Sequence, residues 1–297
     1  MNVGQLAQHF QKNLITGYDE AEIHAIFLVV IEHFLNLKRT DFILKKDQLL
    51  SADTLAQVDE VLQRLIDGEP IQYILGETEF YGLTFKVSPA VLIPRPETEE
   101  LVEWVLETAN DLSAITTSLP QARKNQLPTL IDIGTGSGCI AISLKKNLPN
   151  VTVLALDVAE DSLWVAKENA LLNQVEIEFI HDDILHPNLE LPNQCALIVS
   201  NPPYIKIDEQ IEMHHNVLAN EPHLALFVSN EKPLIFYEAI ADFAKVNLIE
   251  KGFLFFEINE YLGKETMELL KNKGFEDIEL KKDMQGKDRM IRCRKIN

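Results

Sequence analysis

The chain is poor in cysteine, has no long apolar run and carries no excess of basic residues. Its three cysteines, Cys139, Cys195 and Cys293, are odd in number and lack the spacing of metal ligands, which favours a reducing cytoplasm and predicts no metal site. No apolar run approaches the roughly 18 residues that a membrane span requires. The first residues also lack the basic and apolar regions of a signal peptide, so we expect a cytoplasmic protein without membrane contact.

The shortage of positive charge argues against nucleic acid as a partner. The formal net charge is −19, and binding to nucleic acid depends largely on neutralising phosphates. We therefore expect no direct binding of nucleic acid through bulk charge. The interval 281–295 differs, with seven basic residues against Asp283 and Asp288. Two interpretations stay open for it: a solvated hairpin edge whose lysines discourage strand pairing, or a docking patch for an acidic or RNA-bearing partner.

Residues 1–75 have the pattern of a small helical bundle. Apolar residues recur at helical spacing, Asp19 followed by Glu22 is typical of a helix start, and Gly68 with Pro70 ends the last segment. The apolar positions are Leu6, Phe10, Leu14, Ile23, Ile26, Phe27, Val30, Ile31, Phe34, Leu35, Leu55, Val58, Val61, Leu62, Leu65 and Ile66. Nothing in this part carries evident chemistry.

The pattern changes after the bundle. Aromatic and β-branched residues around Gly82 predict that residues 76–95 form a β-hairpin linker. A domain over 96–297 follows, and its interval 108–128, rich in Thr, Ser, Asn and Pro, predicts a surface loop. From Thr129 onward, buried strands alternate with helices, which predicts an α/β, doubly wound, mainly parallel sheet.

The last segments of the chain predict one strand that runs against the others in this sheet. Two apolar runs, 275–280 and 289–294, are joined by a turn at Gln285 and Gly286. A short connection of this kind joins antiparallel strands. We therefore expect a final antiparallel strand.

A glycine-rich loop at residues 134–138 follows the first of the buried strands. Alternate glycines let the backbone approach a ligand closely, and Asp157 ends the next strand, where a carboxylate can accept both ribose hydroxyls. The spacing is G-x-G-x-G rather than the G-x-G-x-x-G of dinucleotide binders, and no P-loop lysine follows. Asp132 before the loop favours a cationic ligand such as S-adenosylmethionine over a dinucleotide. Asp183, after the third strand, is interpreted either as an acceptor for an adenine amino group or as a turn aspartate.

The tetrad Asn201-Pro202-Pro203-Tyr204 follows another buried strand, 196–200. Two prolines make a stiff, extended turn, which leaves backbone carbonyls, an amide and an aromatic ring at the strand end. Ligands bind at this end of the strands in open α/β sheets. The Asn201 side-chain oxygen and the Pro202 carbonyl can accept from a planar NH₂ group, while Tyr204 can stack on it. The tetrad therefore indicates transfer to a poor nitrogen nucleophile.

Together these motifs resemble a class I S-adenosylmethionine-dependent N-methyltransferase. Further runs narrow the resemblance to the peptide-chain-release-factor glutamine N5-methyltransferase family, over nearly the whole chain. These runs are 69–76, Phe80-Tyr81-Gly82, 94–99, Glu221-Pro222 with Ala225-Leu226, and 283–289.

The resemblance implies a seven-stranded class I methyltransferase sheet and methylation of the glutamine in the Gly-Gly-Gln loop of class 1 release factors. The products are the methylated amide and S-adenosylhomocysteine, and the N-terminal bundle recognises the factor. The resemblance assigns the donor site to Gly134, Thr135, Gly136, Ser137, Gly138, Asp157, Asp183, Ile184 and Asn201. It assigns glutamine binding to Asn201, Pro202, Pro203 and Tyr204, of which Asn201, Pro202 and Tyr204 are the catalytic candidates.

Some features depart from the family pattern or have uncertain roles. Arg95 to Glu97 lie by the donor pocket in this family, the interval 108–128 is longer than the family needs, and Ile184 is aliphatic where aromatic residues also occur. We expect a monomer.

Two other function classes stay open. The first is an adenine N6-methyltransferase acting on DNA or RNA, because the tetrad also suits exocyclic amines. Such enzymes need a basic recognition surface, whereas residues 1–90 hold 7 basic and 13 acidic side chains, 7 − 13 = −6. The second is a non-enzymatic scaffold, which would have no use for the tetrad.

Overall fold

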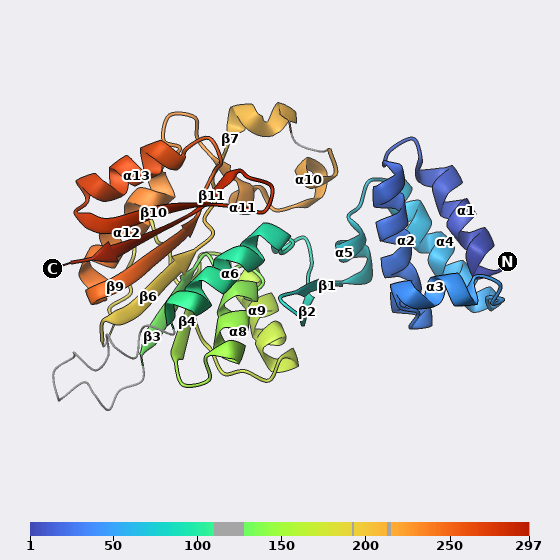
Figure 1. Ribbon diagram of the computed structural model, residues 1–297, viewed down its shortest axis with the longest axis horizontal. Coiled ribbons are helices and arrows are strands. Elements are labelled where there is room, and N and C mark those ends of the chain that lie inside the picture. Colours follow the sequence, from blue (N-terminus) through green and yellow to red (C-terminus); the bar gives the residue numbers. More distant parts are fainter. Residues whose placement is uncertain (110–127, 192, 213–214, 297) are drawn as a thin grey trace. The chain divides into compact units, whose positions relative to one another are not determined.

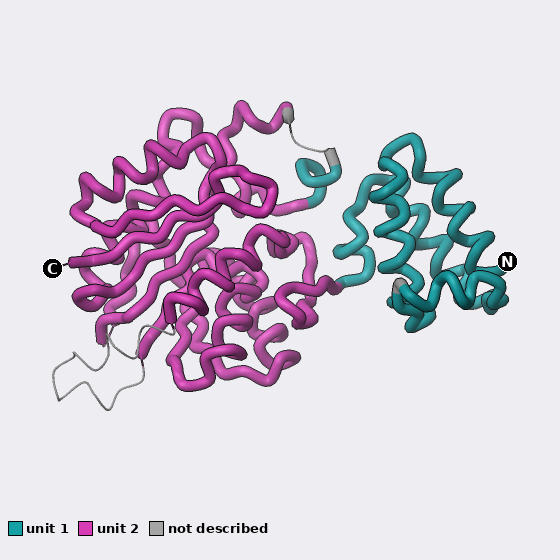
Figure 2. Tube along the Cα trace, in the orientation of Figure 1, with its two compact units in different colours: residues 1–76, 214–220 teal, residues 77–213, 221–297 magenta. Residues whose placement is uncertain are grey.

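The structure is a computed structural model, and it describes residues 1–109, 128–191, 193–212 and 215–296. Contacts between residues divide the chain into two compact units (Figure 2). Unit 1 comprises Met1–Gly76 with His214–Asn220, and unit 2 comprises Glu77–Met213 with Glu221–Asn297. No helix within the described ranges combines the length and apolarity needed to cross a membrane.

Unit 1 contains the helical bundle that the apolar spacing predicts. Asn2, Asp19 and Ser51 begin three of its helices, each accepting a backbone N–H with its side chain. The apolar faces meet in one core, in which Phe10 and Phe27 pack edge to face. The helices are α1 (Val3–Leu14), α2 (Glu20–Leu35), α3 (Arg39–Lys45), α4 (Ala52–Ile66), α5 (Ile71–Leu75) and α10 (His215–Asn220). The last of these comes from far along the chain, which the sequence did not indicate.

Unit 2 is built on a seven-stranded sheet with the order β10-β11-β9-β6-β3-β4-β5 (Figure 1). β11 runs antiparallel to both of its neighbours, β10 and β9, so the predicted final antiparallel strand is confirmed. The strands are β3 (Thr129–Ile133), β4 (Thr152–Asp157), β5 (Glu178–His181), β6 (Cys195–Ser200), β9 (Leu248–Glu257), β10 (Phe275–Lys282) and β11 (Asp288–Lys295). The predicted α/β, doubly wound, mainly parallel sheet is therefore confirmed.

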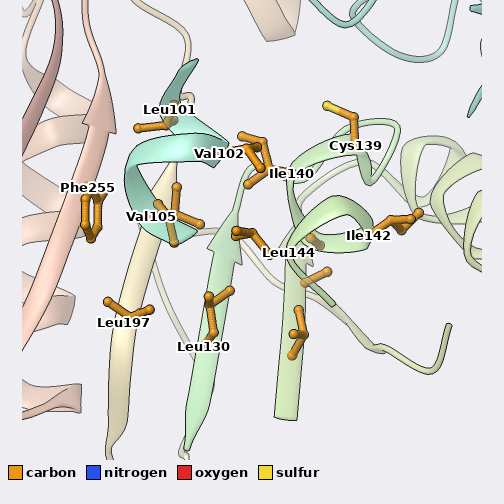
Figure 3. Close-up of a cluster of buried hydrophobic side chains, with 14 of the residues drawn as sticks. Leu101, Val102, Val105, Leu130, Cys139, Ile140, Ile142, Leu144, Leu197 and Phe255 are labelled. Atoms are coloured by element: carbon orange, nitrogen blue, oxygen red, sulfur yellow. The ribbon is translucent and has the colours of Figure 1, made fainter. Parts of the chain in front are cut away.

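Helices cover both faces of this sheet (Figure 1). On one face lie α6 (Pro96–Ala109), α8 (Cys139–Asn147) and α9 (Glu160–Leu172), and on the other lie α12 (Ile235–Asn247) and α13 (Gly263–Asn272). Successive strand residues point to opposite faces: Leu130 packs toward α6 and α8, whereas Ile131 packs toward α12. Figure 3 shows the first of these cores, where α6 and α8 pack over β3, β6 and β9. Because both of their faces are buried, the central strands β3, β4 and β6 are mostly apolar, whereas β10 and β11 carry many charged residues.

The hairpin of β1 (Glu77–Phe80) and β2 (Leu83–Lys86) belongs to unit 2. Two amide side chains of the α9 segment hold it: Asn169 donates to the Lys86 carbonyl and accepts from its N–H, and Asn173 donates to the Thr84 carbonyl. Most of the segment expected as a linker over 76–95 thus belongs to unit 2, and hydrogen bonds tie its hairpin to the α9 segment.

Short elements fill the interval after β6. They are β7 (Ile205–Lys206), the 3₁₀ helix η2 (Ile207–Glu212), α11 (His223–Leu226) and β8 (Phe227–Val228). None was predicted, because two- to six-residue elements carry no readable periodicity. Of the loop predicted at 108–128, residues 110–127 lie outside the described residues.

We expect Gly138→Ala to destabilise unit 2 more than Gly274→Ala does. Both glycines have a positive φ, +82° and +85°, so the backbone strain of an added Cβ is similar. At Gly138 the new Cβ would also lie 2.9 Å from Ile142 Cδ1 and 3.2 Å from Ala166 Cβ, whereas at Gly274 no described atom lies within 4 Å. The extra loss in the free energy of unfolding should be about 1–3 kcal/mol. Urea unfolding followed by the fluorescence of Trp104 and Trp164, both in unit 2, measures it. Equal losses in the two variants would contradict the packing argument.

Candidate active site

The carboxyl ends of four neighbouring strands line one cleft, which lies entirely within unit 2. Gly134 follows β3, Asp157 ends β4, Asp182 follows β5 and Asn201 follows β6. The cleft has about 860 Å³ of space outside the atoms, counting solvent at its mouth. The crevice at this edge is where open α/β sheets bind ligands.

The glycine loop is laid against the end of β4. The N–H groups of Gly134 and Thr135 both donate to the Leu156 carbonyl, at 2.8 and 3.0 Å. Gly134 and Gly136 have positive φ and line the cleft with bare backbone. Thr135, Ser137 and Gly138 are buried, and the Thr135 hydroxyl donates to Asp132 at 2.6 Å. The predicted loop residues therefore divide into two that form the cleft wall and three that are packed inside.

Asp157 lines the cleft, and its carboxylate can accept further hydrogen bonds. Its Oδ2 accepts from Gly136 N at 2.8 Å and its Oδ1 from Ala159 N at 2.9 Å. An ionised carboxylate has about four acceptor positions, so acceptor capacity is left for ligand hydroxyls. Burial raises the pKa of Asp157, and the backbone donors oppose that shift. This arrangement suits a carboxylate that binds a ribose.

Asp132 has an unsatisfied oxygen beneath the same loop. Its side chain is fully buried, and Oδ2 accepts from Thr135 Oγ1 and Ala141 N. Oδ1 has no hydrogen-bond partner among the described residues. Burial raises the pKa of Asp132 to about 7. A buried carboxylate without a counter-charge is costly, so a cationic ligand beside the loop would stabilise its ionised form.

The turn after β5 contributes Asp182, Asp183 and Ile184 to the cleft. Asp182 accepts from the N–H groups of Asn188 and Leu189, and Asp183 accepts from Leu185 N. Both aspartates thus stabilise the turn and also line the cleft. For Asp183 the two interpretations made from the sequence are compatible.

In the tetrad, Asn201, Pro202 and Pro203 line the cleft. The Asn201 side chain donates from Nδ2 to Thr98 Oγ1 at 3.3 Å, which leaves its Oδ1 for a ligand. The Tyr204 hydroxyl is engaged elsewhere, donating to Glu257 Oε1 at 3.0 Å. Burial, with the negative charge of Glu257, holds the pKa of Tyr204 far above its ordinary value.

Part of the cleft wall comes from segments for which the sequence analysis assigned no contact. Residues 90–92 line the cleft, and the Ser162 hydroxyl donates to the Ala90 carbonyl at 2.9 Å. Pro222, Leu224 and Ala225 complete this wall, followed by Phe236 and Ile240 of α12.

Arg95 connects the two segments of this wall. Arg95 Nη2 and Ile93 N both donate to the buried carboxylate of Glu221, at 2.6 and 3.3 Å. Glu97 instead accepts from Gln285 of the C-terminal hairpin. In the sequence, the only signal for Arg95 and Glu221 as part of the site was that both lie in runs that resemble the family pattern.

The basic residues of 281–295 are engaged within their own domain. Five of them form ion pairs with acidic side chains, Lys281 lies over the Trp104 ring, and Lys295 donates to the Leu248 carbonyl. The pairs are Lys282–Asp288, Lys287–Glu260, Arg289–Asp283, Arg292–Glu279 and Arg294–Asp277. This favours the interpretation as a hairpin edge over that as a docking patch.

Comparison with known proteins assigns the chain to a family. Residues 5–76 match the PrmC N-terminal domain, and residues 113–227 match the methyltransferase small domain. The chain is 49% identical to the release factor glutamine methyltransferase of Flavobacterium psychrophilum, over 95% of each chain, and 38% identical to that of Bacteroides thetaiotaomicron, over 97% of this chain and 99% of the other. The chain belongs to the release factor glutamine methyltransferase family. A solved 16S rRNA N2 G1207 methyltransferase from T. thermophilus aligns at 18% identity and a TM-score of 0.49, over 74% of this chain and 49% of that one.

S-adenosylmethionine is the methyl donor of this family, as predicted. The residues present fit it. Gly134 and Gly136 offer bare backbone, Asp157 offers acceptors, and Asp132 Oδ1, unpartnered within the described part of the chain, suits a ligand that carries an ammonium and a sulfonium. When bound, the donor supplies an electrophilic methyl group.

We expect Asp132→Asn to remove a pH dependence of stability in the absence of ligand. The pKa of Asp132 is raised to about 7 in the folded state, so the folded state retains a proton that the unfolded chain releases near pH 4. The stabilisation is complete below about pH 4 and is lost as the pH rises through about 7, at about 1.4 kcal/mol for each pKa unit. Urea unfolding at pH 5 and pH 8 measures it. A difference between wild type and variant that stays constant over this range would contradict the expectation.

Proposed function

We propose that this chain transfers a methyl group from S-adenosylmethionine to the side-chain amide nitrogen, N5, of the glutamine in the Gly-Gly-Gln loop of class 1 peptide chain release factors. The observation that supports this most is the 49% identity, over 95% of both chains, to a protein named release factor glutamine methyltransferase. The adenine N6-methyltransferase alternative is not favoured, since the curated relatives carry the release factor name.

The chemistry demands acceptors rather than a strong base. An amide nitrogen attacks poorly because its lone pair is delocalised into the carbonyl. In our proposal, Asn201 Oδ1 and the Pro202 carbonyl accept from the two N–H bonds of the glutamine NH₂ group, which holds the lone pair toward the methyl group. Positioning of this kind contributes a large part of a rate enhancement. The same acceptors stabilise the positive charge that develops on nitrogen as the bond forms, and once the methyl group has been transferred the nitrogen releases one proton to solvent.

The remaining site residues have supporting tasks in this proposal. Gly134, Gly136, Asp157, Asp183 and Ile184 bind the donor, with Thr135, Ser137 and Gly138 shaping the loop from inside. Pro203 and Tyr204 bound the glutamine, and the bond from the Tyr204 hydroxyl to Glu257 restricts the orientation of that ring.

The wider arrangement follows from the same proposal. The bundle of unit 1 recognises the release factor, the chain acts as a monomer without binding nucleic acid directly, and the reaction takes place in the cytoplasm, where release factors work. The net charge of −19 supports a protein substrate over a nucleic acid.

A labelling experiment tests the substrate. We expect the purified chain, incubated with S-adenosylmethionine labelled in the methyl group, to label a class 1 release factor at one glutamine. A factor in which that glutamine is replaced by alanine serves as the control and should stay unlabelled. Labelling of DNA or rRNA, with none of the factor, would reject the proposal.

Asn201→Ala tests the acceptor role. Removing one acceptor aimed at the reacting group should lower kcat about 10²- to 10³-fold, while the donor Kd stays within about threefold, because the glycine loop and Asp157 are unchanged. Single-turnover methylation and equilibrium binding of the donor measure the two effects. Wild-type kcat in this variant would remove Asn201 from the mechanism.

A further inference from the structure

We propose that Glu257 and Thr98 form a buried hydrogen-bond relay that fixes the direction of the Asn201 side-chain amide, and that both are positioning residues for methyl transfer. This inference rests on the proposed function, in which Asn201 Oδ1 must face the glutamine. Neither residue is among those that line the cleft, so both act through Asn201.

The relay joins three parts of the chain. Glu257 ends β9, which pairs with β6 so that Phe256 lies opposite Ser200, the residue before Asn201. Thr98 lies in the first turn of α6. The Thr98 hydroxyl donates to Glu257 Oε2 at 2.6 Å, and Asn201 Nδ2 donates to Thr98 Oγ1 at 3.3 Å. Thr98 and Glu257 are each only 2% exposed, so little water competes for these bonds.

The direction of the relay follows from the donors and acceptors available. An ionised carboxylate only accepts, and a threonine hydroxyl has a single hydrogen. Since that hydrogen is given to Glu257, Thr98 can offer Asn201 only a lone pair. Asn201 must therefore present its NH₂ group to Thr98, and its carbonyl oxygen faces the other way. The two ends of an amide have nearly the same shape, so packing alone would select poorly between them.

The second oxygen of Glu257 binds the other end of the tetrad. Oε1 accepts from the Tyr204 hydroxyl at 3.0 Å, and Tyr237 donates to the Glu257 backbone carbonyl at 3.3 Å. One carboxylate thus orients both the amide and the ring of the tetrad. Burial raises the pKa of Glu257, whereas the bonds from Thr98 and Tyr204 and the charge of Arg289 favour its ionised form.

Threonine substitutions test the hydroxyl. We expect Thr98→Val, which keeps the shape and removes the hydroxyl, to lower kcat about 10- to 100-fold. The KM for the release factor and the Kd for the donor should stay within about threefold, because the relay acts on the reacting nitrogen and not on binding. Thr98→Ser keeps the hydroxyl and should retain kcat within about threefold. Thr266→Val is the matched control, because that buried hydroxyl donates to the Leu262 carbonyl beside its own helix, α13, so kcat should be unchanged.

A reversal of polarity tests the direction. In Glu257→Gln, the new NH₂ group can donate to Thr98, whose hydroxyl then donates to Asn201 and draws the amide oxygen away from the substrate. We expect kcat to fall by at least about tenfold. In Asn201→Asp, Thr98 lies between two carboxylates, and activity should fall further. When both substitutions are combined, the introduced amide donates to Thr98 and Thr98 donates to the introduced carboxylate, so every bond is satisfied again. The kcat of this double variant should exceed that of Asn201→Asp by at least about tenfold.

The outcomes separate the relay from a general structural role and from the proposed function. Rescue of Asn201→Asp by Glu257→Gln, a change that is harmful on its own, supports the relay, because a loss of packing would be additive. Three outcomes would overturn the relay but leave the proposed function standing. They are wild-type kcat in Thr98→Val, an equal loss of kcat in Thr98→Ser and Thr98→Val, and no rescue of Asn201→Asp by Glu257→Gln. If Glu257→Gln fails to fold, the threonine pair with its Thr266→Val control decides the question. A wild-type chain that does not methylate the release factor would overturn the proposed function, and the relay with it.

Discussion

The register of the parallel strands is the constraint on which the site depends. Ile133 lies opposite both Leu156 and Ser200, and Ser200 lies opposite Phe256. The residues that follow these positions, Gly134, Asp157, Asn201 and Glu257, therefore come to one edge of the sheet although the chain separates them widely. A slip of one residue in any pair would turn a buried apolar row toward the wrong face. The burial of both faces of the sheet thus fixes the site as firmly as it fixes the fold.

Two carboxylates near the cleft are held in surroundings that disfavour charge. Asp132 and Glu257 are both buried, and burial raises the pKa of each. Their partners differ, because both oxygens of Glu257 accept from side-chain hydroxyls, whereas one oxygen of Asp132 has no partner among the described residues. The satisfied carboxylate suits a fixed internal support, and the unsatisfied one suits a ligand that arrives with positive charge.

The sequence predicted most of the fold and one half of the site, for a physical reason. The glycine loop, Asp157 and the tetrad are each contiguous with a strand end, so their chemistry and their place in the sheet could be inferred together. The alternation of strands and helices, with the C-terminal hairpin, predicted the sheet and its antiparallel strand. Glu257 and Thr98 form one bond across 159 positions, and only the strand order and register bring them together. The part of the cleft wall formed by residues 90–92, Pro222, Leu224 and Ala225 depends in the same way on Arg95 and Glu221, which are 126 positions apart.

A signal for Glu257 was nevertheless present, and it explains why a carboxylate suits this position. It is the one charged residue in the run Phe253–Ile258, whose other members are apolar, and a charge at the end of a fully buried strand is costly unless it is hydrogen-bonded. A neutral amide or hydroxyl at residue 257 can both give and accept a hydrogen, so the chain of bonds to Asn201 could run in either direction. An ionised carboxylate allows one direction only. Burying the Glu257 carboxylate is costly, but it fixes the Asn201 amide in a single orientation. A catalytic acceptor requires such a fixed orientation.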